Sequence, residues 1–553
     1  MQLRHLFGIF CLLLAACLPT LPTPSSGGKA QTDAGSAPDA GAAPLGFCAR
    51  HDLREQAFSD EAPSAFQRRQ PAGDFSVPLP FDETFTLSER WTGCDSYIFL
   101  PHDLPISQLN PGSVFTTDLA ELIANSPINV HYFFVIRGNA NGTATQAMQT
   151  LKASIESVLD GMSDEDYDHW IDRLHPVRGT SNQLDGLVKS MFTTPVGQRG
   201  WAIDRFQTIR GIGSLADVRA RNQELANQDM WPWEARLYSA GFEAQYFNFE
   251  ATRHARLEAE TVTEVAVFDG SVVEQFTEGT AMLPSAEVMA GFDTLEFEIL
   301  MECPDRDKAE FNNCGAWDYL GHIWLRDAAD ENWLEMGRII TTYHRESDWV
   351  VDASWALAWL QEGGERRIKY EWAPSWNKQP TGVTFTMRLS NQGKGVAARS
   401  LVPLFTGGGL NAAYNQREPA LFDVPEGTVK TELVVITSGH GMDTQNCAEF
   451  CAHSHHFTLG STTFDQTFPA VGDQSGCAKT VGEGTVPNQG GTWWFGRGGW
   501  CPGREVVPYR QDLTSLVTPG AQSSMVYEAK INGRAPFDDA GNVNLRAYAV
   551  FHR

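Results

Sequence analysis

Three carboxylates of this chain have neighbours that favour acid–base chemistry. Asp318 follows Trp317, and Glu371 is followed by Trp372, while Glu449 lies inside a Cys-x3-Cys spacing. A carboxylate held among aromatic rings or in a tight disulfide loop loses hydration, which raises its pKa and suits it to proton transfer. Two such groups with different pKa values can act as the acid and the base of one reaction. Most of the 68 acidic residues are expected to be solvated surface groups, so these three are candidates because of their surroundings.

The histidines near Glu449 support a competing metal interpretation. The order Cys-x3-Cys-x-His-x-His-His can hold zinc or copper through thiolate and imidazole groups. Cysteines of an exported protein are usually oxidised, and a disulfide sulfur is not a metal ligand. We therefore expect no metal and no other cofactor, with the histidines as solvated residues on a turn and a strand start. The positions concerned are His440, Cys447, Cys451, His453, His455 and His456.

The N-terminus predicts export and a lipid anchor. Residues 1–16 combine a short polar start with an apolar run that is too short to span a bilayer. The run ends in Leu-Ala-Ala-Cys, which resembles a lipobox, so we expect cleavage before Cys17 and lipid on its thiol. A plain secretory signal is the alternative. Residues 17–45, rich in Pro, Ala, Gly and Ser, predict a flexible linker. We expect a protein anchored to the cell envelope, at the periplasmic or surface face of the outer membrane.

The net charge of the chain indicates which kinds of partner it can bind. A formal net charge of −26 argues against nucleic-acid binding, which needs clustered Lys and Arg. We expect the protein to be a monomer.

Eight cysteines remain after the export signal and Cys17 are set aside. Pairing between sequence neighbours is the simplest arrangement, although the sequence leaves other pairings open. The expected disulfides are Cys48–Cys94, Cys303–Cys314, Cys447–Cys451 and Cys477–Cys501.

Residues 46–250 have an α/β pattern. Short apolar runs at 96–100 and 130–136 have the length of buried strands, and helical periodicity follows at 118–124 and 145–162. A hairpin at 201–213 precedes a helix that Ser214 caps and that extends to Gln228. This alternation of strands and helices predicts a sheet covered by helices.

Part of this region resembles the thioredoxin/peroxiredoxin superfamily. The segments are GDFSVP (73–78), TLSERWTG (86–93) and AIDRFQTIRGIG (202–213). Where that family carries its redox cysteine, this chain has PHDLP (101–105), so the resemblance implies a thioredoxin-like domain without thiol chemistry. Cys94 as a displaced nucleophile is the alternative to a structural disulfide with Cys48.

The remainder of the chain alternates between apolar and polar residues, as β-strands do. Alternation is clearest at 295–301 and 383–389, and strand-like runs recur at 526–531 and 545–551. A β region of this size predicts two packed sandwiches. The Gly-rich stretch 405–416 is the expected boundary between them.

The β region resembles the peptide-N-glycosidase F family of bacterial amidases. The matching segments are ECP…C..WD (302–318), GRIITTY (337–343), SGHG…CAEFC…H (438–455) and RGGWCPG (497–503). The six cysteines of the region fall at the family's cysteine positions. The resemblance implies two eight-stranded jelly rolls side by side, at 257–405 and 406–553, with the active site at their interface.

Site roles follow from the same resemblance. It makes Asp318 the principal catalytic carboxylate and Glu449 the carboxylate that binds a bridging water, with Glu371 as a third carboxylate whose alignment needs a one-residue gap. It makes Arg497 a substrate-binding residue. Five further positions are expected in the sugar cleft, and three of them differ from the family, with Tyr for Arg, His for Trp and Phe for Trp. These five are Trp317, Tyr319, Trp372, His440 and Phe450.

The resemblance implies a hydrolase that cleaves the amide between an N-linked glycan and asparagine in glycoproteins or glycopeptides. Two other functions stay open. The altered sugar-cleft positions are compatible with a surface lipoprotein that binds glycans without cleaving them. The double jelly roll also resembles that of copper-dependent peptidylglycine hydroxylating enzymes, which need histidine and methionine ligands on both rolls. The first roll here offers only His322 and His344.

Overall fold

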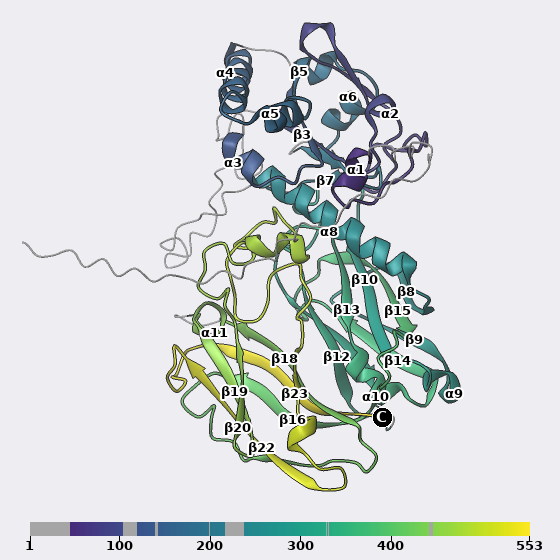
Figure 1. Ribbon diagram of the computed structural model, residues 1–553, viewed down its shortest axis with the longest axis vertical. Coiled ribbons are helices and arrows are strands. Elements are labelled where there is room, and N and C mark those ends of the chain that lie inside the picture. The colour runs from purple at the N-terminus through teal and green to yellow at the C-terminus, as the bar shows by residue number, and fades with distance from the viewer. Residues whose placement is uncertain are drawn as a thin grey trace, which may run out of the picture. The chain divides into compact units, whose positions relative to one another are not determined.

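The computed structural model describes residues 45–102, 119–138, 142–197, 200–215, 237–327, 329, 331–441 and 446–553. These residues form a mixed α/β sheet region followed by two β-sandwiches (Figure 1). Within the described ranges, every helix is too short or too polar to cross a membrane. Cys17, most of PHDLP and most of the helix expected after Ser214 lie outside these ranges.

The N-terminal sheet has the strand order β5-β4-β3-β6-β7. Its parallel strands β3 (Ser96–His102), β4 (Val130–Ile136) and β5 (Leu174–Thr180) are joined by the antiparallel hairpin β6 (Trp201–Ile203) and β7 (Ile209–Gly211). Every residue of β3 and β4 is buried, as expected for parallel strands covered on both faces. The predicted α/β layout is therefore confirmed. A separate ribbon pairs β1 (Ser76–Pro78) with β2 (Thr84–Thr86).

Helices surround this sheet, and the last of them leads to the β region. The shorter ones are α1 (Phe47–Arg50), α2 (Leu87–Arg90), α3 (Leu119–Ala124), α4 (Gly142–Leu159), α5 (Asp164–Ile171) and α6 (Gly186–Thr193), with the 3-10 turns Pro80–Asp82 and Ser181–Gln183. Helix α8 (Ser239–Ala259) continues past residue 250, where the α/β region was expected to end. Figure 1 shows α8 passing from the α/β region to the first sandwich.

The first sandwich packs the sheet β13-β10-β15-β8 against the sheet β12-β11-β14-β9. Alternating inward side chains such as Phe297, Phe385 and Met387 fill its core. Its strands are β8 (Thr263–Glu274), β9 (Phe276–Ser285), β10 (Thr294–Glu302), β11 (Leu320–Arg326), β12 (Trp333–Ile340), β13 (Ser347–Asp352), β14 (Gly363–Glu371) and β15 (Pro380–Ser390). The short helices are α9 (Ala286–Met289) and α10 (Leu357–Leu360), with a 3-10 turn at Ser354–Ala356.

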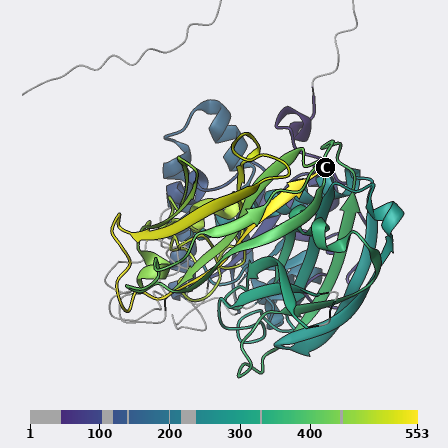
Figure 2. The ribbon, with the colours of Figure 1, turned by 90° about the horizontal axis from the view of Figure 1, so that it is seen from below.

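The second sandwich pairs the sheets β16-β23-β18-β21 and β17-β22-β19-β20 and lies beside the first (Figure 2). Because β16 begins at residue 398 and pairs with β23, the chain leaves the first sandwich before the Gly-rich stretch expected as the boundary. The strands are β16 (Ala398–Gly409), β17 (Ala420–Asp423), β18 (Lys430–His440), β19 (His453–Leu459), β20 (Thr462–Thr467), β21 (Tyr509–Asp512), β22 (Gln522–Ile531) and β23 (Asn542–His552). The helical turns are α11 (Cys447–Phe450), Ala478–Glu483 and Thr514–Leu516.

One hydrophobic core joins the α/β region to the second sandwich. The long connection between β20 and β21 contributes Trp493, Trp494 and Phe495 to the same cluster as the buried side chains of β3, β4 and α8. Phe242 of α8 meets the Trp493 ring edge-on at 6.3 Å. This connection therefore belongs to two structural regions at once. All four expected disulfides are present in the structure.

Candidate active site

Asp318 lies in the connection between β10 and β11, two residues before β11 begins. The Cys303–Cys314 disulfide closes the first part of this connection. The second part is fixed by Thr341, whose hydroxyl accepts from the Tyr319 amide at 2.8 Å. The carboxylate is 15% exposed, so it is mostly shielded yet still reachable from solvent.

Glu449 lies on α11, a single helical turn that the Cys447–Cys451 disulfide spans. Its Oε2 atom accepts from the Gly441 amide at 3.1 Å. Its backbone carbonyl accepts from the Gly498 amide at 2.8 Å. The helical turn is therefore tied to β18 and to the connection that carries Arg497, and the carboxylate is held in one orientation.

Arg497 brings the two carboxylates together. Its Nε atom lies 2.9 Å from Oε1 of Glu449, and its Nη2 atom lies 3.5 Å from Oδ2 of Asp318. The Nη1 atom donates to the backbone carbonyls of Thr492 and Phe495 at 3.0 and 2.9 Å. The guanidinium is buried, and its planar fork suits a contact with several oxygens in fixed directions. The first sandwich supplies one carboxylate and the second sandwich supplies the other, as expected for a site at their interface.

Tyr343, which had no predicted role, completes this group. Its hydroxyl is hydrogen-bonded to Asp318 and accepts from Nη2 of Arg497 at 3.5 Å. The ring is buried against Gly491, where an added Cβ would lie only 2.7 Å from it. The segment 337–343, which ends in Tyr343, was among the matching motifs, and this was the signal available in the sequence.

Burial changes the proton affinity of both acids. Desolvation raises the pKa of Glu449 to about 7, and the nearby Asp318 charge adds to this while Arg497 opposes it. Burial likewise raises the pKa of Asp318, against the opposing effects of Arg497 and the Tyr343 hydroxyl. Two acids that face one cation in a poorly hydrated site titrate as a pair. The pair can therefore hold a proton near neutral pH, which general acid–base catalysis requires.

Comparison with known proteins shows which family part of the chain resembles. Residues 410–550 match the family model "Peptide-N-glycosidase F, C terminal". The peptide-N(4)-(N-acetyl-beta-D-glucosaminyl)asparagine amidase F of Elizabethkingia miricola is 23% identical over 295 residues, which cover 49% of this chain and 78% of that protein. The resemblance to the peptide-N-glycosidase F family is confirmed.

Solved structures of this family align with about half of the chain. PNGase F, a glycosylasparaginase from Flavobacterium meningosepticum, is 20% identical, with coverage of 53% of this chain and 96% of that chain and a TM-score of 0.41. PNGF-II is 14% identical, with coverage of 54% and 67% and a TM-score of 0.41.

Glu371, the third carboxylate expected from the peptide-N-glycosidase F resemblance, lies apart from the other two. It ends β14, where its Oε2 atom accepts from Nε1 of Trp324 at 3.0 Å and lies 3.1 Å from Nζ of Lys369. Within the described part of the chain, no recorded hydrogen bond or ion pair joins it to Asp318 or Glu449. Its side chain is 38% exposed, so it remains accessible to a bound molecule.

The aromatic positions expected from the peptide-N-glycosidase F resemblance fall into two groups. Trp317 is 46% exposed, and Tyr319 lies edge-on to Trp376 at 5.7 Å. Trp376 is 69% exposed and was not among the expected residues. Trp372, in contrast, is 3% exposed in the core of the first sandwich and stacks on Tyr370. Its indole is mostly covered by protein, although Trp372 lines one cavity together with Trp317 and Tyr319, so its substrate-binding role stays a prediction.

The two other departures from the family pattern lie around the guanidinium. His440 stacks on Trp500 at 4.9 Å, and its Nε2 atom lies 2.9 Å from the Ser438 hydroxyl. Burial, together with nearby cations, lowers the pKa of His440 to about 3, so its ring is neutral at pH 7. Phe450 lies against Arg497, with the guanidinium carbon 5.3 Å from the ring centre. Trp500 lies against the same guanidinium carbon at 4.8 Å, so Phe450 and Trp500 cover the cation.

The histidine-rich stretch is not arranged as a metal site. The two cysteines are bonded to each other, so they offer no thiolate ligands. His453 faces His455 at 3.1 Å, His455 faces the Tyr527 hydroxyl at 2.7 Å, and His456 faces Asp465 at 2.6 Å. Among residues with described positions, no cluster of three or more His, Cys, Asp or Glu side chains has a metal-binding arrangement. These histidines form hydrogen bonds within the second sandwich and are not the solvated residues expected from the sequence.

The two histidines of the first sandwich have separate surroundings. His322 lies 2.8 Å from Glu335, which also pairs with Arg338. His344 packs its ring against Phe311 with the ring centres 4.2 Å apart. These surroundings give no support to the copper-site interpretation.

Proposed function

We propose that this protein hydrolyses the amide bond between an N-linked glycan and asparagine in glycoproteins or glycopeptides. One observation carries the proposal: Asp318 and Glu449 come from different sandwiches and face the same buried guanidinium of Arg497. The match of the second sandwich to the peptide-N-glycosidase F family supports the choice of substrate.

The reaction needs a nucleophilic water and a proton for the leaving nitrogen. Glu449 holds the water and accepts one of its protons as the oxygen attacks the amide carbon. Asp318 delivers a proton to the nitrogen as the carbon–nitrogen bond breaks. The products are an aspartic acid side chain in the peptide and a glycosylamine. One hydrogen of the water stays on the new carboxyl group, and the other passes from Glu449 to Asp318 to replace the proton given to the nitrogen. Positioned acids and bases contribute roughly 10²–10⁴-fold each to reactions of this kind.

Arg497 and Tyr343 serve the same step electrostatically. The guanidinium stabilises negative charge on the carboxylate that has lost its proton, and it requires no reorganisation because backbone carbonyls already fix it. The Tyr343 hydroxyl holds the Asp318 carboxyl in place. Glu371, which is exposed and separate, orients the glycan or peptide. Trp317, Tyr319 and the newly found Trp376 provide aromatic faces for sugar rings.

The decisive experiment compares two substitutions on a defined N-glycopeptide. Asp318→Asn is expected to abolish release of the glycan and conversion of asparagine to aspartate, both read by mass spectrometry. Asp293→Asn is the matched control, because Asp293 is also a buried acid of the first sandwich, bonded to the amides of Gln392 and Lys394. Full activity in the Asp318 variant contradicts the proposal. Glycan binding by the unaltered protein without any release supports the non-catalytic alternative.

We also propose that the α/β region is a thioredoxin-like domain without thiol chemistry. The support is its sheet, in which β3 and β4 are parallel and the hairpin β6–β7 follows antiparallel beside β3. Cys94 is bonded to Cys48 and both are buried, in keeping with a structural disulfide. The two sandwiches would each be a jelly roll. An insulin-reduction assay of the unaltered protein tests the absence of thiol chemistry. We expect no reductase activity above background, and measurable activity contradicts the proposal.

Export with a lipid on Cys17 is a further proposal. Its support is the N-terminal sequence, and the four disulfides fit an oxidising compartment. Partition of the unaltered protein into the detergent phase, and of a Cys17→Ala variant into the aqueous phase, is the expected result. Equal partition of the two contradicts the anchor.

A further inference from the structure

Helix α8 reaches the candidate active site through a buried ionic contact. Glu243 of α8 is fully buried, and its two carboxylate oxygens lie 2.7 and 3.3 Å from Nη1 and Nη2 of Arg345. Its Oε1 atom also accepts from the side-chain amide of Asn488 at 2.9 Å. One acid of the α/β region therefore holds a residue of the first sandwich and a residue of the β20–β21 connection at the same time.

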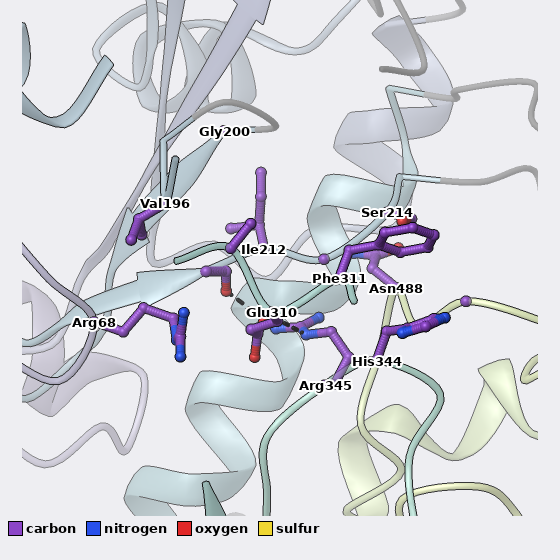
Figure 3. A pocket seen from close by; sticks show the side chains of 14 residues that line it. Arg68, Val196, Gly200, Ile212, Ser214, Glu310, Phe311, His344, Arg345 and Asn488 are labelled. Carbon is purple, nitrogen blue, oxygen red and sulfur yellow. Dashed lines mark hydrogen bonds and ion pairs between the residues drawn. The ribbon is translucent and has the colours of Figure 1, made fainter. Parts of the chain in front are cut away.

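Figure 3 shows the surroundings of this contact, with Arg345, Glu310 and Asn488 near one another beside a cavity. Nε of Arg345 lies 2.8 Å from Glu310. A second hydrogen bond runs from the Asn488 amide to the Ser239 carbonyl at the start of α8, at 2.8 Å. Since each of these groups is buried, the loss of one leaves its partners without solvent to replace it.

Both residues held by Glu243 adjoin Tyr343. Arg345 follows it by two positions, and Asn488 precedes Gln489, whose side-chain carbonyl accepts from the Tyr343 amide at 2.9 Å. The Gly490 amide donates to the Tyr343 carbonyl at 3.1 Å. Tyr343 in turn contacts Asp318 and Arg497 through its hydroxyl. A continuous series of contacts therefore leads from α8 to the two carboxylates.

We propose that Glu243 is a positioning residue for the active site, so that the α/β region is a working part of the enzyme and not an appended domain. This inference rests on the proposed amidase function. A displacement of about 1 Å in a catalytic group can lower a rate about 100-fold. Glu243 acts through Arg345 and Asn488 and touches neither the substrate nor the reacting atoms.

The test compares two substitutions that each weaken one ion pair of α8 with the first sandwich. Glu243→Gln keeps the shape of the side chain and removes its charge. Asp348→Asn is the control, since Asp348 pairs at 2.8 Å with Arg253 of the same helix and, among the described residues, forms no hydrogen bond or ion pair with the Tyr343 segment. For each variant we would measure kcat and KM on an N-glycopeptide, thermal stability, and hydrogen exchange of peptides covering 337–346 and 486–498.

For Glu243→Gln we expect kcat to fall about 10- to 100-fold with KM changed less than about threefold. Hydrogen exchange should become faster in both peptides. The control should keep its kcat and its exchange in these peptides even where its melting temperature falls equally. Unchanged exchange in Glu243→Gln overturns the inference, whether or not the protein is active. Faster exchange with unchanged kcat, or an equal loss of kcat in both variants, also overturns it.

The exchange measurement separates this inference from the proposed function. If the unaltered protein releases no glycan, the proposed function fails, and with it the catalytic part of the inference. Faster exchange in Glu243→Gln would then still show that α8 positions the Tyr343 segment. Rescue by Glu243→Asp is a further check, because its shorter carboxylate retains the charge and should recover part of kcat.

Discussion

Nε of Arg497 lies 2.9 Å from Oε1 of Glu449, and its Nη1 atom donates to two backbone carbonyls, of Thr492 and Phe495. This contact makes the acid inside the Cys447–Cys451 disulfide loop part of a larger group that includes Asp318. Asp318 belongs to the first sandwich and Glu449 to the second, and both carboxylates contact the Arg497 guanidinium. The position of each carboxylate relative to the other therefore depends on this cation.

Replacement of Arg497 by lysine should remove the guanidinium that places Asp318 and Glu449 relative to one another while retaining the positive charge. A lysine ammonium cannot donate in the fixed planar directions that the two carboxylates and the carbonyls of Thr492 and Phe495 now use. We expect kcat to fall about 100-fold or more, in the range seen when one electrostatic donor is lost. Steady-state kinetics on an N-glycopeptide measures this, and circular dichroism checks that the fold is kept. A variant with kcat within about threefold of normal would show that the bridging geometry is dispensable.

The stability of the protein should depend on the protonation of Glu449. Its pKa is about 7 in the folded protein, above the ordinary value of 4.5, because burial disfavours the charged form. The folded protein therefore binds more protons than the unfolded chain between these values, and stability should fall as pH rises through this window. We expect Glu449 to account for a loss of about 1–3 kcal/mol between pH 5 and pH 8.

Glu449→Gln supplies the comparison for this prediction. Glutamine cannot titrate, so the variant should lack the part of the pH dependence that belongs to position 449. Urea denaturation at pH 5 and pH 8 gives the free energy of unfolding for both proteins. Parallel pH profiles in the two proteins would contradict the raised pKa.

Tyr343→Phe should separate packing from catalysis. The ring is retained against Gly491, while the hydroxyl that contacts Asp318 and Arg497 is lost. We expect a cost of about 1 kcal/mol in stability and a fall in kcat of about 10-fold, with a smaller change in KM. Kinetics and thermal denaturation of the same preparation test both parts. A rise in KM with kcat unaffected would instead assign Tyr343 to substrate binding.

Two tryptophans near the site should respond differently to removal. Trp376 is 69% exposed, so Trp376→Ala should leave the melting temperature nearly unchanged and raise KM for a glycopeptide about 10-fold. Trp372 is buried in the first sandwich, and Trp372→Ala should cost about 3–5 kcal/mol of stability. Calorimetry and glycopeptide kinetics distinguish the two effects. Equal KM in the Trp376 variant and the unaltered protein would remove Trp376 from the substrate-binding surface.

The sequence was informative where local pattern and tertiary structure agree. The apolar runs that became β3 and β4, and the alternating runs within β10 and β15, were predicted because buried strands require those residue types. Helix α8 was not predicted. Residues 239–244 of this helix are all buried, so the helix has no solvent-exposed polar face there that would give a clear periodicity.

The residues of the candidate site could likewise be predicted only in part. Asp318, Glu449 and Arg497 could be selected as candidates because they lie in motifs with distinctive cysteine and glycine spacing. Trp372 and Trp376 were harder to distinguish, because two tryptophans four positions apart give no sign of which one is buried. Tyr343 acquires its role only through contacts with residues distant in sequence. The Gly-rich stretch 405–416 was misleading for another reason, since its three glycines are the last residues of β16.

The core that α8 shares with Trp493, Trp494 and Phe495 also constrains the order in which the chain can fold. The strands of the α/β region are made first, whereas the tryptophans that complete their hydrophobic cluster lie near the opposite end of the chain. Contacts over such separations form slowly, because a long loop must be closed before they gain any stability. During synthesis, the α/β region therefore keeps part of its apolar surface exposed until the β20–β21 connection has been made and can pack against it.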